Sequence, residues 1–298
     1  MNSLRTNYLL LLILMTILFG LTFIASKIAL QGLGIFRLIF LRYVLALILL
    51  SLVLWRDRKK FYIAKRDRRH FLLLTLIEPI GYFIFETIGI KYTTPSNVSL
   101  IIATIPIFSL IFALWILHES ANRYAITGIF LSLFGVYLIV SQQLESILAP
   151  RPLLGNLFAA GAAMSAGLYN SLCRRLTRTY SPWTITYYQS IVATIVFLPM
   201  AVTESFILSE QFVNAQIIVS LFYLSFGGSV IAFFILNYTL SKLPTYRVAI
   251  FANFIPVVTI LASWGIYGDM LKSMQILGAI LIVFGIYLTH FRFKKDSK

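Results

Sequence analysis

Long apolar stretches recur along the whole chain, and short polar stretches separate them. Each apolar stretch is long enough to cross the roughly 30 Å of hydrocarbon in a bilayer as a helix. Backbone polar groups cannot stay unpaired in hydrocarbon, so each stretch is predicted to be helical, whereas a β-barrel would show shorter alternating segments. The pattern predicts an all-α membrane protein with ten transmembrane helices, bounded to within a few residues at 8–27, 35–55, 71–90, 96–117, 124–141, 153–173, 184–203, 216–238, 246–267 and 273–290.

Composition agrees with this pattern. The 298 residues are 59% hydrophobic and 12% charged, whereas a soluble domain carries about 25% charged residues. The formal net charge of +15 would suit a nucleic-acid partner, but the basic residues lie mainly in alternate loops between spans. There they serve as topology signals and can contact anionic lipid head groups. We therefore expect membrane lipid around the protein and no nucleic-acid partner.

The basic loops also predict the orientation. With ten spans they all fall on one side of the membrane, while the opposite loops hold Glu145, Glu204 and Glu210. Basic loops are retained in the cytoplasm, so both termini are predicted to be cytoplasmic. The basic positions are Arg56, Arg58, Lys59, Lys60, Lys65, Arg66, Arg68 and Arg69 after the second span, Arg174, Arg175 and Arg178 after the sixth, and Arg292, Lys294, Lys295 and Lys298 in the tail.

The chain contains an internal repeat. When it is shifted by 150 residues, 98–138 matches 248–288 without a gap, including Pro106 with Pro256 and Gly135 with Gly285. Each half holds five spans, an odd number, so the second half must enter the membrane from the opposite side. This predicts two inverted-topology five-helix repeats, which suit alternating access around a midplane site. The repeats are placed at 1–145 and 151–292, followed by a basic cytoplasmic tail at 293–298.

An ordered set of residues along both halves carries a family resemblance. The set comprises Phe19, Gly20, Arg42, Pro106, Glu119, Gly128 and Gly135 in the first half, and Pro256, Asp269, Gly278 and Gly285 in the second. The chain resembles the drug/metabolite transporter superfamily, of the ten-helix type with two EamA domains. Two positions depart from the family pattern: Asp269, where glutamate is more frequent, and Ser165-Ala166, where an aromatic-small pair is common. The resemblance implies export of a small solute and leaves amino acids, metabolites, nucleotide sugars and drugs open.

Two prolines occupy corresponding places in the two halves. A proline inside a helix frees the carbonyl four residues before it, here that of Ile102 for Pro106 and that of Ala252 for Pro256. In lipid a freed carbonyl needs a partner or a wet cavity, and interrupted helices at matching places are typical of transport sites. Pro106 and Pro256 are therefore candidate site residues, and a packing kink is the alternative interpretation.

A polar stripe marks the third span. Thr75, Glu78, Tyr82, Glu86 and Gly89 fall within an arc of about 80° on a helix. Intramembrane ionisable groups usually face a cavity or a partner. We expect Arg42, in the second span, to pair with Glu86 as an outer gate or an anchor for a substrate carboxylate. Glu78 is the candidate proton carrier, and simple solvation of Glu86 near the outer end is the alternative.

Other polar side chains lie in the later spans. Candidate substrate contacts are the amides Asn170, Gln189, Asn237 and Asn253, together with Trp264, which shares a helical face with Asn253 and Pro256. For each amide a hydrogen bond between helices is an equal alternative. Small residues at four-residue spacing in the sixth span, from Gly155 to Gly167, favour close helix packing within the chain or in a homodimer.

Searches for other chemistry give negative results. The chain has no Gly-x-x-x-x-Gly-Lys loop, no metal-ligand spacing and no nucleophile–base set, and its only cysteine is Cys173. We expect no cofactor and no enzymatic activity. The sequence predicts a secondary transporter of the inner membrane of a bacterium or archaeon, exporting amino acids or related small metabolites. The alternative is an integral-membrane enzyme or lipid-handling protein.

Overall fold

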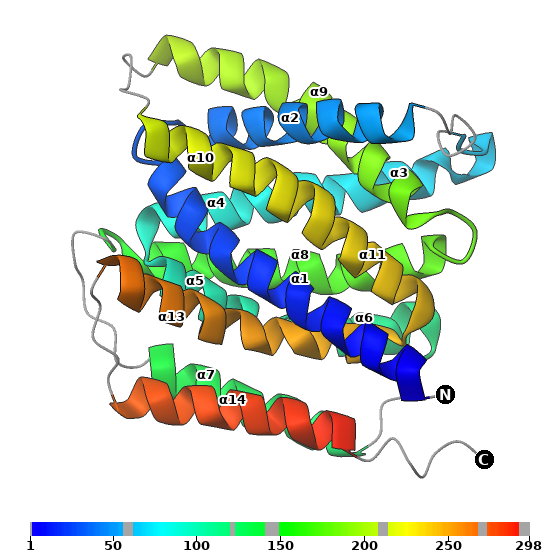
Figure 1. The fold of residues 1–298 in the computed structure, drawn as a ribbon, viewed down its shortest axis with the longest axis vertical. Helices are drawn as coiled ribbons and strands as arrows, with labels where there is room; N and C mark the ends of the chain where they lie inside the picture. The colour runs from blue at the N-terminus through cyan, green and yellow to red at the C-terminus, as the bar shows by residue number, and fades with distance from the viewer. Residues whose placement is uncertain are drawn as a thin grey trace.

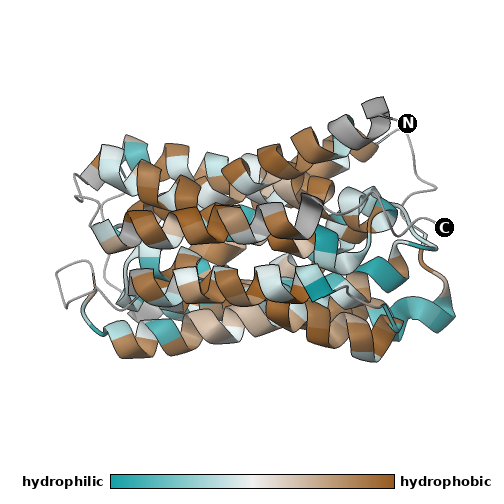
Figure 2. Cartoon of the chain, turned by 90° about the horizontal axis from the view of Figure 1, so that it is seen from below, coloured by the Kyte–Doolittle hydropathy of each residue, from teal (hydrophilic) through white to brown (hydrophobic). Residues whose placement is uncertain are grey.

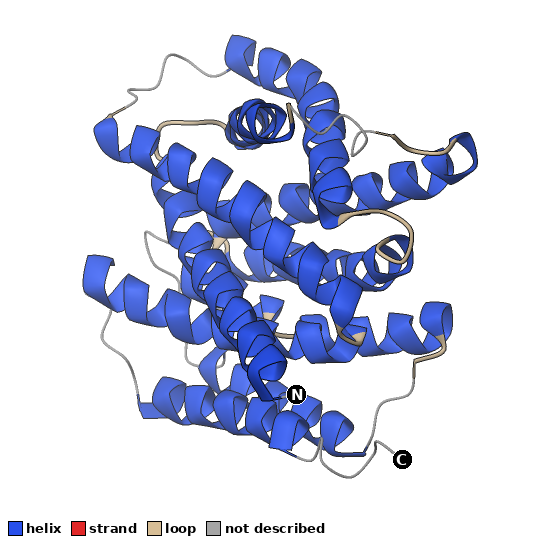
Figure 3. Cartoon of the chain, turned by 45° about the vertical axis from the view of Figure 1, so that its right-hand side comes forward, coloured by secondary structure: helices blue, strands red, loops and turns tan. Residues whose placement is uncertain are grey.

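The computed structural model describes residues 2–55, 62–119, 123–140, 149–207, 214–267 and 273–291. Within these ranges the chain forms helices joined by short connections and contains no β-strand (Figure 3). The helices lie side by side in a bundle (Figure 1). The expectation of an all-helical membrane protein is confirmed. The basic tail 293–298, the loop 56–61 and Asp269 lie outside the described residues.

The first half runs from α1 to α7, and its third and fourth spans each consist of several pieces. The helices are α1 Asn2–Ala29, α2 Ile35–Leu54, the 3-10 turn η2 Lys65–Asp67, α3 Arg68–Thr75, the π-helical segment η3 Leu76–Gly81, α4 Tyr82–Tyr92, α5 Pro95–Ile102, α6 Ile105–Phe112, the π-helical segment η4 Ala113–Leu117 and α7 Arg123–Val140.

The second half runs from α8 to α14 and has interruptions in its third and fourth helical segments. The helices are α8 Pro152–Leu176, α9 Pro182–Ile207, α10 Ala215–Tyr223, the π-helical segment η5 Leu224–Ala232, α11 Phe233–Lys242, α12 Thr245–Ala249, the 3-10 segment η6 Ile250–Phe254, α13 Ile255–Tyr267 and α14 Ser273–Phe291.

Many helices present apolar surface to their surroundings. Among the described residues, seven helical segments are long and apolar enough to cross a membrane, and α7 and α14 each contain a shorter apolar stretch. Most of the helical ribbon in Figure 2 carries the colour of hydrophobic residues. Side chains such as Leu52, 68% exposed, and Leu153, 75% exposed, would be unfavourable in water but suit contact with lipid. The protein is therefore an integral membrane protein.

Reciprocal glycine contacts join α7 and α14, which lie along each other at one edge of the bundle (Figure 1). A Cβ atom on Gly135 would lie 2.6 Å from the carbonyl oxygen of Gly278. A Cβ atom on Gly285 would lie 2.5 Å from the carbonyl oxygen of Gly128. Only glycine permits this approach at these two positions, so the matched pair Gly135 and Gly285 fixes how closely the two helices pack.

Small residues of α8 serve packing inside the chain. A Cβ atom on Gly155 would meet Thr93 at 2.8 Å, and one on Gly167 would overlap Phe108. Ala159 and Ala163 between them are fully buried. α8 can therefore approach α4, α5 and α6 closely, and the stripe expected for packing is used within the chain.

Among the described residues, three spans are interrupted next to a proline, one more than the sequence suggested, and the π-helical η5 interrupts the eighth span without a proline. In the third span the backbone of Glu78 is extended, with φ −147° and ψ 118°, directly before Pro79. Proline disfavours the helical conformation in the residue before it. The fourth and ninth spans break before Pro106 and Pro256, each of which is the second residue of a new helix. A proline there removes no helical hydrogen bond, so these two start helices rather than kink continuous ones.

Candidate functional site

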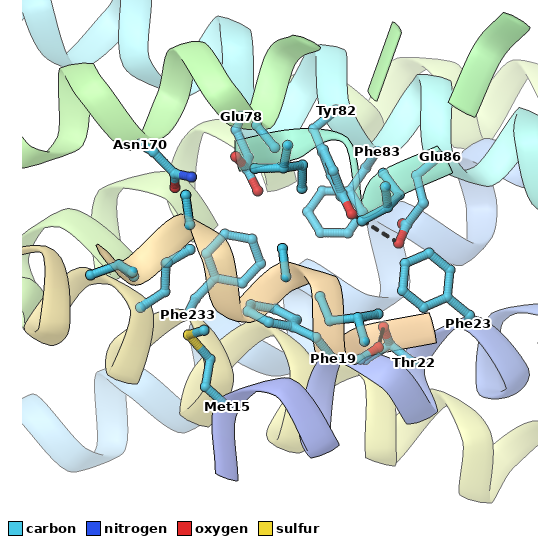
Figure 4. A pocket seen from close by; sticks show the side chains of 18 of the residues that line it. Met15, Phe19, Thr22, Phe23, Glu78, Tyr82, Phe83, Glu86, Asn170 and Phe233 are labelled. Carbon is cyan, nitrogen blue, oxygen red and sulfur yellow. Dashed lines mark hydrogen bonds between the residues drawn. The ribbon is translucent and has the colours of Figure 1, made fainter. Parts of the chain in front are cut away.

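A cavity with about 590 Å³ of empty space, part of it open to the surroundings, lies between the interrupted helices (Figure 4). Aromatic and aliphatic side chains form most of its wall, and a few ionisable and polar groups interrupt them. The lining residues are Met15, Phe19, Thr22, Phe23, Arg42, Glu78, Tyr82, Phe83, Glu86, Ile102, Ile105, Ala166, Asn170, Phe233, Leu236, Val248, Ala249, Ala252 and Ile255.

The helix breaks bring backbone from both halves to the cavity. Ile102 and Ile105 flank the break between α5 and α6, and Ala252 and Ile255 lie at the junction of η6 and α13. Each residue of the first pair lies 150 positions before its counterpart in the second. Pro106 and Pro256 are buried next to these residues but are not part of the wall. The prolines thus shape the site without lining it.

The polar stripe of the third span points into the cavity. Glu78, Tyr82 and Glu86 project from one side, opposite Phe19, Phe23 and Phe233 (Figure 4). Glu78 is 3% exposed and Glu86 2% exposed, and Oε2 of each has no hydrogen-bond partner. Two buried carboxyl groups, each with an unused acceptor, therefore share one largely apolar space.

Arg42 lines the same cavity, but the ion pair expected with Glu86 is not formed in this conformation. Its Nε donates to Oγ of Ser229 at 2.6 Å, and its Cζ lies 4.3 Å from the centre of the Phe83 ring. Glu86 instead accepts a hydrogen bond from the Tyr82 hydroxyl at 3.4 Å. The nearby η5 segment and the aromatic ring hold the guanidinium, and neither was identifiable as its partner from the sequence.

Two of the expected substrate contacts belong to a buried network behind the cavity. Asn237 accepts from the Tyr169 hydroxyl at 2.5 Å and donates to Oγ1 of Thr186 at 3.0 Å. Gln189 donates to the backbone carbonyl of Glu78 at 3.2 Å. Neither amide is part of the cavity wall. Both make the hydrogen bonds between helices that were the alternative interpretation, and Gln189 supports the broken third span.

The remaining candidates divide in the same way. Asn170 lines the cavity and donates to Oγ of Ser109 at 3.0 Å. Asn253 is 1% exposed with neither amide atom hydrogen-bonded, but it is not in the wall, so its role stays a prediction. Trp264 is 53% exposed and is not part of the wall. The helical face predicted from Asn253 to Trp264 is therefore not a cavity face along its whole length.

Sequence reasoning missed most of the aromatic wall. Phe23, Phe83 and Phe233 line the cavity, and Met15 of α1 joins them. Apolar side chains in apolar helices carry no signal that separates a cavity-facing residue from a lipid-facing one. The break at Pro79 did have a signal, because that proline lies in the middle of a predicted span directly after Glu78.

Polar clusters also join the helices near the two ends of the bundle. Arg174 Nε lies 2.5 Å from Oε1 of Glu119, and Arg174 Nη1 donates to the carbonyl of Leu240 at 2.5 Å. Near the opposite end, where α1 and α4 finish, Lys27 Nζ donates to the carbonyl of Ile90 at 2.8 Å (Figure 1). Ile90 and Leu240 are 150 positions apart, so both halves use a cation to bind the same carbonyl of the repeat.

The part of the chain that the structure describes contains no group of three histidine, cysteine, aspartate or glutamate side chains arranged to hold a metal ion. Cys173 is buried, and its thiol donates to Oδ1 of Asn237 at 3.1 Å. The residues that line the cavity offer charge, hydrogen bonding and apolar contact for recognition.

Comparison with known proteins identifies a family for this sequence. The sequence matches the EamA-like transporter family twice, over residues 6–141 and 153–291. It is 30% identical over 294 residues to an uncharacterized transporter of Archaeoglobus fulgidus, covering 97% of this chain and 98% of that protein. It is 26% identical over 292 residues to the uncharacterized transporter YcxC of Bacillus subtilis, covering 96% and 93%.

A relative of Salmonella typhimurium, 24% identical over 294 residues, is named a probable amino-acid metabolite efflux pump, and the match covers 95% of this chain and 94% of that protein. A solved structure entitled "Crystal structure of protein" shares the fold at 15% identity, with a TM-score of 0.76 over 95% of this chain and 98% of the other. The resemblance to the drug/metabolite transporters is thus confirmed, and a role as a transporter rather than an enzyme follows. This chain belongs to the EamA-like transporter family.

Proposed function

We propose that this protein is a secondary transporter that exports amino acids or related small metabolites by alternating access, with the substrate held in this cavity. The observation that carries the proposal is the position of this cavity, where interrupted helices from both halves meet around buried ionisable groups. Ionisable groups inside a membrane are costly and mark solute pathways. Broken helices at matching places are typical of transporter sites.

The ten-helix, inverted-repeat architecture is part of the proposal. Three pairs of features separated by 150 positions support it: the glycines of α7 and α14, the cavity residues at the two breaks, and the carbonyls bound by Lys27 and Arg174. The boundaries at 1–145 and 151–292 follow from the same register. A pseudo-twofold axis in the membrane plane would relate the halves.

Alternating access needs contacts that hold one end closed while the other opens. The pair Arg174–Glu119 ties α8 to the end of the fourth span, and Glu119 also accepts from the backbone N–H of Thr245 at 2.9 Å. In the predicted orientation this cluster faces the cytoplasm. Lys27, which binds the Ile90 and Thr93 carbonyls, would act at the outer end. Rocking of the two halves would break one set while the other persists.

The substrate assignment rests on a relative's name and on the cavity. The relative named a probable amino-acid metabolite efflux pump matches this chain over nearly its whole length. The cavity offers both carboxylates and a guanidinium beside apolar walls. These groups can recognise a small solute with charged and apolar parts. Homodimer formation stays a prediction. The small residues of α8 that suggested it are buried within the chain.

Counterflow in proteoliposomes tests the proposal. Vesicles loaded with one unlabelled solute are diluted into the same solute carrying a radiolabel, over a panel of amino acids, amines derived from them and nucleosides. We expect label to accumulate for at least one solute, and to fall to the level of empty vesicles when Glu86→Gln replaces the wild type. Glu204→Gln is the control, since Glu204 lies outside the cavity and binds the backbone of Arg37. An absence of counterflow across the panel, with turnover of a lipid instead, would overturn it.

A further inference from the structure

The charges around the cavity do not balance. The residues with charged side chains that line it are Arg42, Glu78 and Glu86. Each is at most 3% exposed. Buried charges must be paired or neutralised, because removing them from water is costly. One guanidinium offsets one carboxylate, so the wall carries one surplus negative charge whenever both carboxyl groups are ionised.

Arg42 is poorly placed to capture a carboxylate from a ligand. Its Nε is used by Ser229, and its face lies against the Phe83 ring. Its Nη2 lies so close to the backbone of Gly228 that a Cβ atom there would be 2.7 Å away. A carboxylate binds arginine best through two parallel N–H groups. With the Nε edge occupied and Nη2 against η5, the guanidinium acts mainly as a fixed counter-charge of the wall.

The acidic side of the cavity is open to a donor. Oε2 of Glu78 and Oε2 of Glu86 have no hydrogen-bond partner, and an ionised carboxylate can only accept. The rings of Phe19, Phe23 and Phe233 face them across the cavity (Figure 4). Aromatic faces attract cations, and they also bury apolar groups. The wall therefore combines surplus acceptors with aromatic surface.

We infer that the ligand of this cavity is an organic monoamine cation, with one ammonium group beside an apolar body, and that it exchanges with a proton held by the Glu78–Glu86 pair. The ammonium donates to the free carboxylate oxygens, and the apolar body packs among the phenylalanines. The displaced proton leaves to water, so the cavity is neutral both before and after binding. The other titratable side chains around the pair are Tyr43, Tyr82, Tyr169 and Cys173.

This inference rests on the proposed function only for the statement that the ligand is transported. Binding is tested separately, by titration calorimetry on the purified full chain with three probes that share a phenyl ring. Phenethylamine carries an ammonium group, phenylalanine is a zwitterion, and 3-phenylpropionate carries a carboxylate. We expect phenethylamine to bind at least about tenfold more tightly than phenylalanine, a difference of roughly 1.4 kcal/mol, and 3-phenylpropionate not to bind.

Proton exchange gives a second readout. Titrations with phenethylamine in buffers of different ionisation enthalpy should show release of about one proton per ligand. Glu78→Gln and Glu86→Gln should each weaken amine binding and reduce this release, while Glu204→Gln should leave both unchanged. If a cavity variant fails to fold, the three-probe series and the proton release of the wild type still decide the matter.

Equal or tighter binding of phenylalanine would overturn the inference in favour of a zwitterion site, and binding of 3-phenylpropionate would make Arg42 the anchor. Amine binding without proton release would remove the exchange. The two proposals fail separately: amine binding without counterflow of any solute would contradict transport, whereas counterflow of uncharged solutes without amine binding would contradict the ligand class.

Discussion

Arg174 and Glu119 are 55 residues apart in the sequence, and their side chains meet with Nε 2.5 Å from Oε1. The same two residues also bind backbone at the junction of the eighth and ninth spans, through the Leu240 carbonyl and the Thr245 N–H. One ion pair thus gathers four predicted spans at one end of the bundle. In the proposed transport cycle, opening this end would separate them.

Breaking this pair should loosen that end of the protein. Arg174→Gln or Glu119→Gln is expected to lower the thermal unfolding temperature. The loss of unfolding free energy should be smaller than the roughly 3–5 kcal/mol typical of breaking a fully buried pair, because the side chains are 19% and 16% exposed. The double variant should be no less stable than the worse single variant, since neither charge is then left alone. Additive losses would show that the two residues act independently.

Arg42 should couple to Ser229 rather than to Glu86. Removal of Ser229 takes away the hydrogen bond to Nε, worth about 1.5–3 kcal/mol when one partner is charged. In thermal unfolding, a double-mutant cycle of Arg42→Gln with Ser229→Ala should show coupling above about 0.5 kcal/mol. The matching cycle with Glu86→Gln should show less. The reverse order would indicate that the ion pair forms in the conformation that dominates in solution.

The glycine contact between α7 and α14 should not tolerate a methyl group. Gly135→Ala would bring Cβ to 2.6 Å from the Gly278 carbonyl oxygen, so the helices must separate at a cost of about 1–3 kcal/mol. Gly265→Ala is the matched control, because nothing lies within 4 Å of its added Cβ. Gly265 lies inside α13, where alanine is favoured over glycine by up to about 1 kcal/mol of helix propensity. Gly265→Ala should therefore not lower the unfolding temperature. Similar unfolding temperatures for both variants would contradict the close approach.

Two aromatic residues should differ in their effect on binding and transport. Phe233 lines the cavity and packs edge-to-face on Phe19 with ring centres 5.4 Å apart. Trp264 is half exposed and outside the wall. Phe233→Leu is expected to reduce counterflow several-fold, while Trp264→Leu should leave it near wild type. Loss of transport in the Trp264→Leu variant alone would show that Trp264 contributes to the substrate site.

Accessibility of single cysteines tests the proposed topology. Cys173 is the only cysteine and is buried, so Cys173→Ala gives a cysteine-free background. Cysteines placed at Ser3 and Ser297 should both resist a membrane-impermeant maleimide in intact cells and react after lysis. Cysteine at Asn214, which begins the eighth span, should react in intact cells. Labelling of only one terminus would rule out an even number of spans.

The apolar pattern determined that this chain is helical and lies in a membrane. That conclusion needed no tertiary information, because hydrocarbon forces each long apolar segment to satisfy its own backbone hydrogen bonds. The sequence also placed Arg42, Glu78, Tyr82, Glu86 and Asn170 among the candidates, and all five line the cavity. Their polarity inside apolar spans is costly, so it was visible without a structure.

The tertiary structure alone decided which groups meet. Gln189 and Asn237 were as conspicuous in sequence as Asn170, yet only Asn170 reaches the cavity. Arg42 contacts Ser229 and Phe83 rather than Glu86. The phenylalanines of the wall had no sequence signal that distinguished them from other apolar residues. Depth and helical face can be read along one segment. The partner across a gap depends on how helices distant in sequence pack, and in an apolar medium many arrangements bury the same residues.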